Sequence, residues 1–172
     1  MGGIKGQRIL AVILFLVGIF FLHPGVSPAQ QKPQLDLKTT VEKEVKIKKD
    51  GKWATERMPV EKAGRGDVLA YTVTYLNTGK TDAVDAQIVN PIPRGVAIIP
   101  ESPEGKDAEI SVSIDGGKSW HKPPVTVQIK KPDGTTVVTP VSADRYTHVR
   151  WIIKKPVMSG RSGQVGFRAT VK

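Results

Sequence analysis

The stretch GDVLAYTVTYLNTGKTDAVDAQIVNPIPRGV, residues 66–96, decides the fold class of this chain. Residues 68–76 are rich in β-branched and aromatic side chains and place Leu69, Tyr71, Val73 and Tyr75 on one face. That alternation predicts a strand with one buried face. The segment Asn77-Thr78-Gly79-Lys80-Thr81-Asp82 then carries turn chemistry, because Gly79 is free to take a positive φ.

The second half of the stretch predicts a strand and a change of sheet. Apolar positions alternate again at Val84, Ala86 and Ile88. Pro91 and Pro93 each remove a backbone donor, so they suit a point where the chain leaves one sheet. Gly95 then leads into residues 96–99, which we expect to pair in the other sheet.

The same period of two recurs along the rest of the chain, between turn signals. Residues 35–47 alternate strictly and reach the hairpin signal Asp50-Gly51, and Pro59 places the returning strand at a sheet edge. The remaining strands are expected around residues 110–114, 125–129, 135–141, 148–154 and 165–171. Asp115-Gly116-Gly117 is another hairpin signal, and further turns are expected at Pro132-Asp133-Gly134 and residues 159–163.

About seven to nine short strands with no helix after residue 29 predict an all-β chain. The regular turn spacing favours an immunoglobulin-like antiparallel β-sandwich, and an up-and-down barrel is the alternative. The side chains expected in its core are Tyr71, Val73, Ile88, Trp151 and Phe167.

The N-terminus has the layout of a secretory signal peptide. Lys5 and Arg8 precede the apolar run 9–22, and Ser27-Pro28-Ala29 offers small residues before a cut between Ala29 and Gln30. A retained anchor is the alternative, although the run is shorter than the roughly 20 residues of a spanning helix. The sequence thus divides into a signal peptide (1–29), an extension with the first strand (30–40) and the sandwich (41–172). We expect export to the periplasm, the cell surface or the medium, with membrane contact only before cleavage.

Two segments resemble a known family, the bacterial and archaeal conserved-repeat domain of unknown function (number eleven). They are AGRGDVLAYTVTYLNTGKTDAVDAQIVNPIPRGV (63–96) and THVRWIIKKPVMSGRSGQVGFRATV (147–171). The resemblance implies an immunoglobulin-like module of exported or surface proteins, without catalytic residues to transfer. Arg65 stands where the family usually has proline, and a single copy departs from the family's multi-repeat habit. The matching motif residues are Gly66, Asp67, Tyr71, Thr72, Asn77, Thr78, Gly79, Pro91, Pro93, Gly95, Trp151 and Phe167.

Catalytic and metal chemistry find little support in the sequence. There are 3 histidines and no cysteine, and His121 and His148 lie far apart in the chain. No serine lies in a Gly-x-Ser-x-Gly or Ser-x-x-Lys context. Asp115-Gly116-Gly117 and Asp133-Gly134 lack the alternating ligands of a calcium loop. We therefore expect no enzyme, no cofactor and no metal site, while an unrecognised hydrolase stays open as a rival.

The charge of the chain bears on its partners. It has 26 basic and 16 acidic residues, a net charge of +10. One basic cluster lies on the first strand (Lys43, Lys46, Lys48, Lys49) and another near the C-terminus (Arg145, Arg150, Lys154, Lys155, Arg161). Export argues against nucleic acid. The remaining readings are lysines that protect exposed edge strands and attraction to anionic envelope polymers or lipid head groups.

The predicted function is a non-catalytic structural or interaction module of the cell envelope or surface, with an envelope protein or anionic polymer as partner. We expect Trp53 and Trp120 to pack at the ends of the sandwich; one alternative function is a carbohydrate-binding module, in which they are partly exposed and stack on sugars. Another is assembly by strand exchange, because the first strand is long, about 40 Å at 3.3 Å per residue. Pairing of this strand within its own chain is favoured by the turn at Asp50-Gly51. The oligomeric state stays open.

Overall fold

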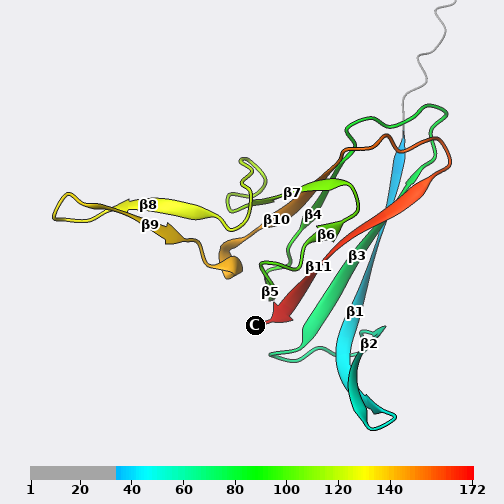
Figure 1. Ribbon diagram of the computed structural model, residues 1–172, viewed down its shortest axis with the longest axis horizontal. Coiled ribbons are helices and arrows are strands. Elements are labelled where there is room, and N and C mark those ends of the chain that lie inside the picture. The colour runs from blue at the N-terminus through cyan, green and yellow to red at the C-terminus, as the bar shows by residue number, and fades with distance from the viewer. Residues whose placement is uncertain (1–33) are drawn as a thin grey trace, which may run out of the picture. The chain divides into compact units, whose positions relative to one another are not determined.

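The computed structural model describes residues 34–172 and consists almost entirely of antiparallel strands (Figure 1). Within these residues the one helical segment is a 3-10 turn, η1. The strands are β1 (Leu35–Lys49), β2 (Lys52–Pro59), β3 (Val68–Asn77), β4 (Gln87–Pro91), β5 (Val96–Ile98), β6 (Glu104–Gly105), β7 (Ala108–Ser113), β8 (Thr126–Lys130), β9 (Thr136–Pro140), β10 (His148–Ile153) and β11 (Ser162–Val171), and η1 spans Ala143–Arg145.

Two antiparallel sheets make up the sandwich. The larger has the strand order β2-β1-β3-β11-β5, with β6 paired to β11, and the smaller has the order β4-β10-β7. The remaining strands, β8 and β9, pair only with each other. The expected antiparallel β-sandwich is therefore confirmed.

Aromatic side chains join the two sheets at the centre of the core. Phe167 of β11 lies opposite Tyr71 of β3, and their rings stack with centroids 4.7 Å apart. Trp151 of β10 reaches across from the smaller sheet to within 6.3 Å of the Phe167 ring centroid. Trp151 is fully buried, and the five side chains predicted for the core, which include Val73 and Ile88, are all buried. Faces assigned from alternation are thus correct for β3, β4, β10 and β11.

The turn and the sheet change predicted from glycine and proline are both present. Asp50 and Gly51 have φ angles of 50° and 78°, as a two-residue hairpin turn requires. β2 ends at Pro59 and lies at the sheet edge. After Pro91, the last residue of β4, the chain leaves the smaller sheet and enters β5 of the larger one.

The buried face expected for the first strand is wrong in part. Its register places Leu37 opposite Tyr75 and Val41 opposite Tyr71, so these side chains share the core side of the sheet. Yet Leu37 is 50% exposed and Val41 is 36% exposed. The larger sheet is five strands wide along its main path and the facing sheet only three, so β1 and β2 lie beside the core without a covering layer.

Two smaller expectations also fail. Val84 is 67% exposed because it lies in the loop before β4, whereas Ala86 and Ile88 are buried as expected. Asp115-Gly116-Gly117 does turn the chain, but no returning strand forms within the described residues. A single bridge joins Val112 to His121 instead.

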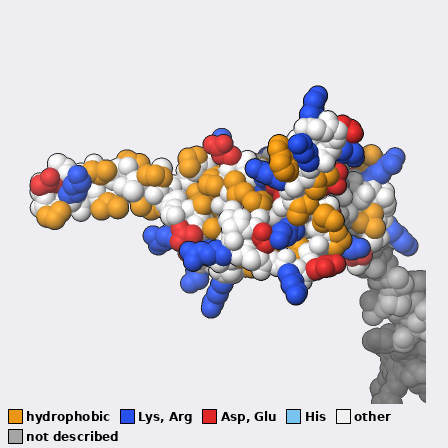
Figure 2. Space-filling view, turned by 90° about the horizontal axis from the view of Figure 1, so that it is seen from below, with side chains coloured by type: hydrophobic (Ala, Val, Ile, Leu, Met, Phe, Trp, Pro, Cys, Tyr) orange, Lys and Arg blue, Asp and Glu red, His pale blue; other side chains and the backbone are white. Residues whose placement is uncertain are grey.

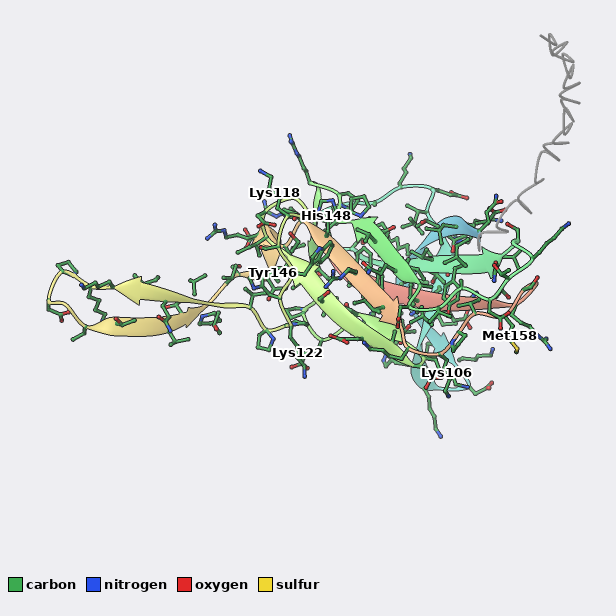
Figure 3. The ribbon with its side chains drawn as sticks, turned by 90° about the horizontal axis from the view of Figure 1, so that it is seen from above. Lys106, Lys118, Lys122, Tyr146, His148 and Met158 are labelled. Carbon is green, nitrogen blue, oxygen red and sulfur yellow. The ribbon has the colours of Figure 1, made fainter. Side chains whose placement is uncertain are left out.

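The β8–β9 hairpin, here called the arm, extends away from the sandwich (Figure 1). Its base is fixed by Tyr146, whose hydroxyl accepts a hydrogen bond from the Val125 N–H at 3.0 Å. Val125 and Val141 are buried there and joined by a backbone hydrogen bond of 2.8 Å. Figure 3 shows Tyr146 at this junction. Beyond its base, the arm makes no ladder with either sheet.

The expected signal peptide and its cleavage site, Ala29 and Gln30, lie outside the described residues. Among residues 34–172, no helix has the length and apolar character needed to cross a membrane. The strand β1 runs without a break through residues 40 and 41, where the sequence suggested a boundary between extension and sandwich.

Candidate functional site

The loop after β7 gathers several polar side chains around Asp115. Its carboxylate accepts hydrogen bonds from the hydroxyls of Ser119 at 2.6 Å and Ser113 at 2.7 Å, and from the backbone N–H groups of Lys118 and Ser119. These donors, Ser119 first, hold the pKa of Asp115 far below its usual value. The Asp115 carboxylate therefore holds this glycine-containing loop together by accepting hydrogen bonds from its residues.

Asp115, Ser119 and His121 also form a chain of contacts, with Ser119 Oγ 3.0 Å from His121 Nε2. The order differs from that of a hydrolytic triad, in which histidine lies between the serine and the acid. Here the Ser119 hydroxyl donates to Asp115, so its oxygen is left to accept from the imidazole. His121 is therefore not the acceptor of the Ser119 proton, as the histidine of a hydrolytic triad is.

Trp120 lies beside this loop and is only partly exposed. The Arg150 guanidinium carbon sits 4.5 Å from the Trp120 ring centroid, and Arg150 Nε donates to Ser111 Oγ at 3.0 Å. The His148 ring meets the indole edge-on, with centroids 6.4 Å apart. Figure 3 shows Lys118 and His148 at this end of the sandwich. Because Arg150 covers one face of the indole, Trp120 is a poor platform for a sugar ring.

Trp53 is different, since 72% of its surface is exposed. It lies opposite Lys48 near the tip of the β1–β2 hairpin, on the face of the sheet that points away from the core. Lys46 and Thr55 form the next pair on that face, and Lys52 precedes Trp53. Lys46, Lys48 and Lys52 make no ion pair with any residue of the described range. Trp53, Lys46 and Lys48 form the hairpin tip, an exposed indole beside two ammonium groups, whereas Lys52 lies opposite Lys49 on the core-side face.

The second basic cluster of the sequence does not form a comparable surface. Lys154 pairs with Glu109 at 2.5 Å and Lys155 with Asp107 at 3.0 Å, while Arg150 is occupied by Trp120 and Ser111. Three members of that cluster, Arg150, Lys154 and Lys155, are therefore engaged by residues of β7 or just before it.

A third surface is the uncovered core-side face of β1 and β2, here called the shelf. Register places Val45 and Ile47 of β1 on the same face as Ala54 of β2, and Lys43 opposite Met58. Met58 is 50% exposed. The apolar members of the shelf are Leu37, Val41, Val45, Ile47, Ala54 and Met58.

Motif residues behind the family resemblance occupy structural positions. Asn77 is fully buried; its amide donates to the carbonyls of Thr81 and Val157 at 2.8 Å, and its oxygen accepts from the Gly79 N–H. It thus ties the turn at Thr78 to the loop between β10 and β11.

The turn before β3 is hydrogen-bonded to the end of the C-terminal strand, β11. Asp67 accepts from the Gly64 N–H and pairs with Lys43, both at 2.7 Å, and the hydrogen bond from Gly64 followed by that from Lys43 lowers the pKa of Asp67. The Gly66 N–H donates to the Val171 carbonyl. The other motif residues form the core (Tyr71, Trp151, Phe167), line β3 (Thr72) or lie around the sheet change (Pro91, Pro93, Gly95).

No cluster of three or more histidine, aspartate or glutamate side chains among the described residues has the geometry to hold a metal ion. Comparison with family models, with curated proteins and with solved structures finds no match to this chain. The family resemblance therefore stays a prediction that rests on the two quoted segments.

The sequence favoured packing of Trp53 and Trp120 at the ends of the sandwich, which is wrong for Trp53 because it is 72% exposed, and the shelf and the arm were not predicted. The alternation in β1 was visible, but the width of the facing sheet was not. For the arm one signal was present: residues 125–129 and 135–141 contain no charged side chain in a chain rich in lysine.

Proposed function

We propose that this chain is a non-catalytic exported interaction module of the cell envelope that binds an anionic envelope polymer with its β1–β2 hairpin tip. The observation that carries the proposal is the exposed Trp53 beside Lys46 and Lys48, which make no ion pair within the described residues. Ammonium groups attract phosphate and carboxylate groups, and an indole adds apolar contact to a sugar ring at little entropic cost. The full sequence has a net charge of +10, and loss of Lys5 and Arg8 with residues 1–29 leaves +8, which still favours approach to a polyanion.

Three further features support an interaction role over an enzymatic one. The Ser119 hydroxyl donates its proton to Asp115 and not to His121. The Arg150 guanidinium group covers one face of the Trp120 ring. Exposed apolar side chains gather on the shelf and the arm, and exposed apolar patches are typical of interaction surfaces.

A carbohydrate-binding module is the second candidate, favoured by the 72% exposure of Trp53. The two candidates differ in their dependence on charge. A polyanion binds more weakly as salt rises, because screening shortens the reach of the lysines, whereas stacking of a neutral sugar is nearly indifferent to salt.

The test compares binding to heparin, a soluble polyanion, with binding to neutral dextran of similar mass. We expect heparin binding that weakens with salt and falls about ten-fold in Trp53→Ala and in Lys48→Glu, which corresponds to about 1.4 kcal/mol. Lys131→Glu, at the arm tip, changes the net charge by the same amount and is the matched control. Binding of dextran that ignores salt would favour the carbohydrate module instead. Equal losses in Lys48→Glu and Lys131→Glu would show that charge acts without a site, and the proposed role of the hairpin tip would be wrong.

A further inference from the structure

The shelf is an apolar surface that continues the core sideways. Leu37 and Val41 lie on the same sheet face as Tyr75 and Tyr71, yet they are 50% and 36% exposed while the two tyrosines are buried. The facing sheet stops short, since it has three strands against the five of the larger sheet's main path. Two strands, β1 and β2, thus lack a covering layer.

The arm is a second exposed surface: Val127 near its base packs against the core, and beyond it the arm pairs with neither sheet within the described residues. Its register places Ile129 opposite Val137 and Val127 opposite Thr139, so one face of the hairpin is apolar. Ile129 is 49% exposed and Val137 36%. An isolated two-stranded hairpin is marginally stable in water and needs packing on one face. A two-stranded arm matches the width of the two uncovered strands.

Charge distinguishes the arm from the rest of the surface. The chain has a net charge of +10, or +8 after loss of residues 1–29, so copies repel one another through most approaches. The arm shaft, residues 125–129 and 135–141, carries no charge, and Figure 2 shows charged side chains only at its outer tip on the face in view. On the shelf face, Lys43 and Glu56 follow the apolar residues Leu37 and Val41, and Lys49 and Lys52 lie at the hairpin turn. The uncharged arm shaft of a second copy is therefore an apolar surface that could cover the shelf without bringing further positive charge to it.

The arm cannot reach the shelf of its own chain. Its base continues into η1, which contacts β5, the strand at one end of the larger sheet. The shelf lies at the opposite end, with β3 and β11 between them. Tyr146 and the Val125–Val141 hydrogen bond hold the arm base in place.

We propose that the shelf is covered by the arm of a second copy of this chain, in which Ile129 and Val137 of the arm pack against Leu37 and Val41 of the shelf. The contact joins two different surfaces, so each copy offers one of each and the assembly grows head to tail into chains or closes into a ring. β1 is already paired on both edges, by β2 and β3, so this is packing between faces and not the exchange of a strand. The surfaces involved are distinct from the outward-facing hairpin tip, and the inference goes beyond the proposed function.

The test uses two variants that each remove one half of the contact. Leu37→Lys places a charge on the shelf and leaves the arm intact; Ile129→Lys does the reverse. Their matched controls are Thr40→Lys on the other face of β1 and Val138→Lys on the other face of the arm, where Val138 is 60% exposed. The protein is produced from the full sequence and purified as the cell leaves it, and mass in solution is followed by sedimentation over a range of concentrations.

We expect the unaltered chain and both controls to assemble as concentration rises, while the midpoint for each of the two variants shifts upward about ten-fold or more. A mixture of Leu37→Lys with Ile129→Lys should form a one-to-one complex that grows no further, because one intact arm still meets one intact shelf. Ile129→Thr keeps a β-branched residue and so preserves the strand. A loss of assembly in this variant as well is therefore not due to melting of the arm. A monomer at every concentration would overturn the proposal. So would assembly of Leu37→Lys alone without any gain on mixing, since that result means arm-to-arm contact.

Discussion

Leu37 and Tyr75 lie opposite each other in the β1–β3 ladder and share one face of the sheet, but Leu37 is 50% exposed and Tyr75 only 7%. The difference arises from what lies above them: the smaller sheet covers β3 and stops before β1. A single strand pair thus marks the border between the core of this domain and a surface available to another molecule.

Processing of the N-terminus is the first prediction. We expect the exported protein to begin at Gln30, because small residues precede it after the apolar run 9–22. Intact mass of protein recovered from the host envelope or medium measures this directly. Recovery of residues 1–29 in the membrane fraction would mean that the segment is an anchor.

The core prediction concerns Trp151. Its side chain is fully buried and contacts Phe167, so Trp151→Ala should lower the free energy of unfolding by about 3–5 kcal/mol. Trp151→Phe should cost less, because it keeps an aromatic ring and removes an indole N–H that has no hydrogen-bond partner in the described structure. Denaturant melts of the three proteins provide the comparison. A loss below about 1 kcal/mol for the alanine variant would contradict the packing described.

Asn77 should be among the most sensitive polar positions. Asn77→Asp removes both N–H groups that bind the Thr81 and Val157 carbonyls and sets a carboxylate against them. We expect a loss of about 2–3 kcal/mol in the free energy of unfolding at neutral pH. Asn90→Asp, at a half-exposed asparagine of β4 that binds only the Pro91 carbonyl, is the matched control and should change stability little. Equal losses of stability in the two variants would mean that the Asn77 hydrogen bonds to Thr81 and Val157 do not stabilise the fold.

Stability should fall in acid through Asp115. Hydrogen bonds from Ser119, then Ser113 and Lys118, lower the pKa of Asp115 in the folded chain, so the folded state binds its proton less readily than the unfolded state. The stabilisation is then complete above the unfolded pKa of about 4 and is lost as pH falls below it. Unfolding midpoints in urea between neutral pH and strong acid should drop less steeply in Asp115→Asn than in the unaltered chain. Identical slopes would show that other carboxylates carry the acid sensitivity.

Much of the fold follows from local sequence signals. Alternation identified the buried faces of β3 and β10, and Asp50-Gly51 and Pro91 marked a hairpin and a change of sheet, because each of these features acts within a few residues. The exposure of Leu37 depends instead on how many strands the opposite sheet contains. That number is set by pairings between distant segments, such as β4 with β10, which alternation within one strand does not encode.

The candidate surfaces were harder to predict for the same reason. Lys154 and Arg150 looked free in the sequence, but Glu109 and Ser111 of β7 lie beside them only after the smaller sheet forms. Trp53 and its lysines were visible because the hairpin places sequence neighbours together. The arm was predicted as one more strand pair of the sandwich, since its alternation resembles that of the other strands.

The most direct test of the account is a cross-link between two copies, which the absence of cysteine makes clean. One chain carries Leu37→Cys and the other, distinguished by a mass tag, carries Ile129→Cys; they are mixed and treated with a short bismaleimide. We predict that the mixed dimer dominates, while a mixture of Thr40→Cys with Val138→Cys gives only background. Dominance of Ile129→Cys homodimers, or equal yields from both mixtures, would contradict an arm seated on the shelf of a neighbouring copy.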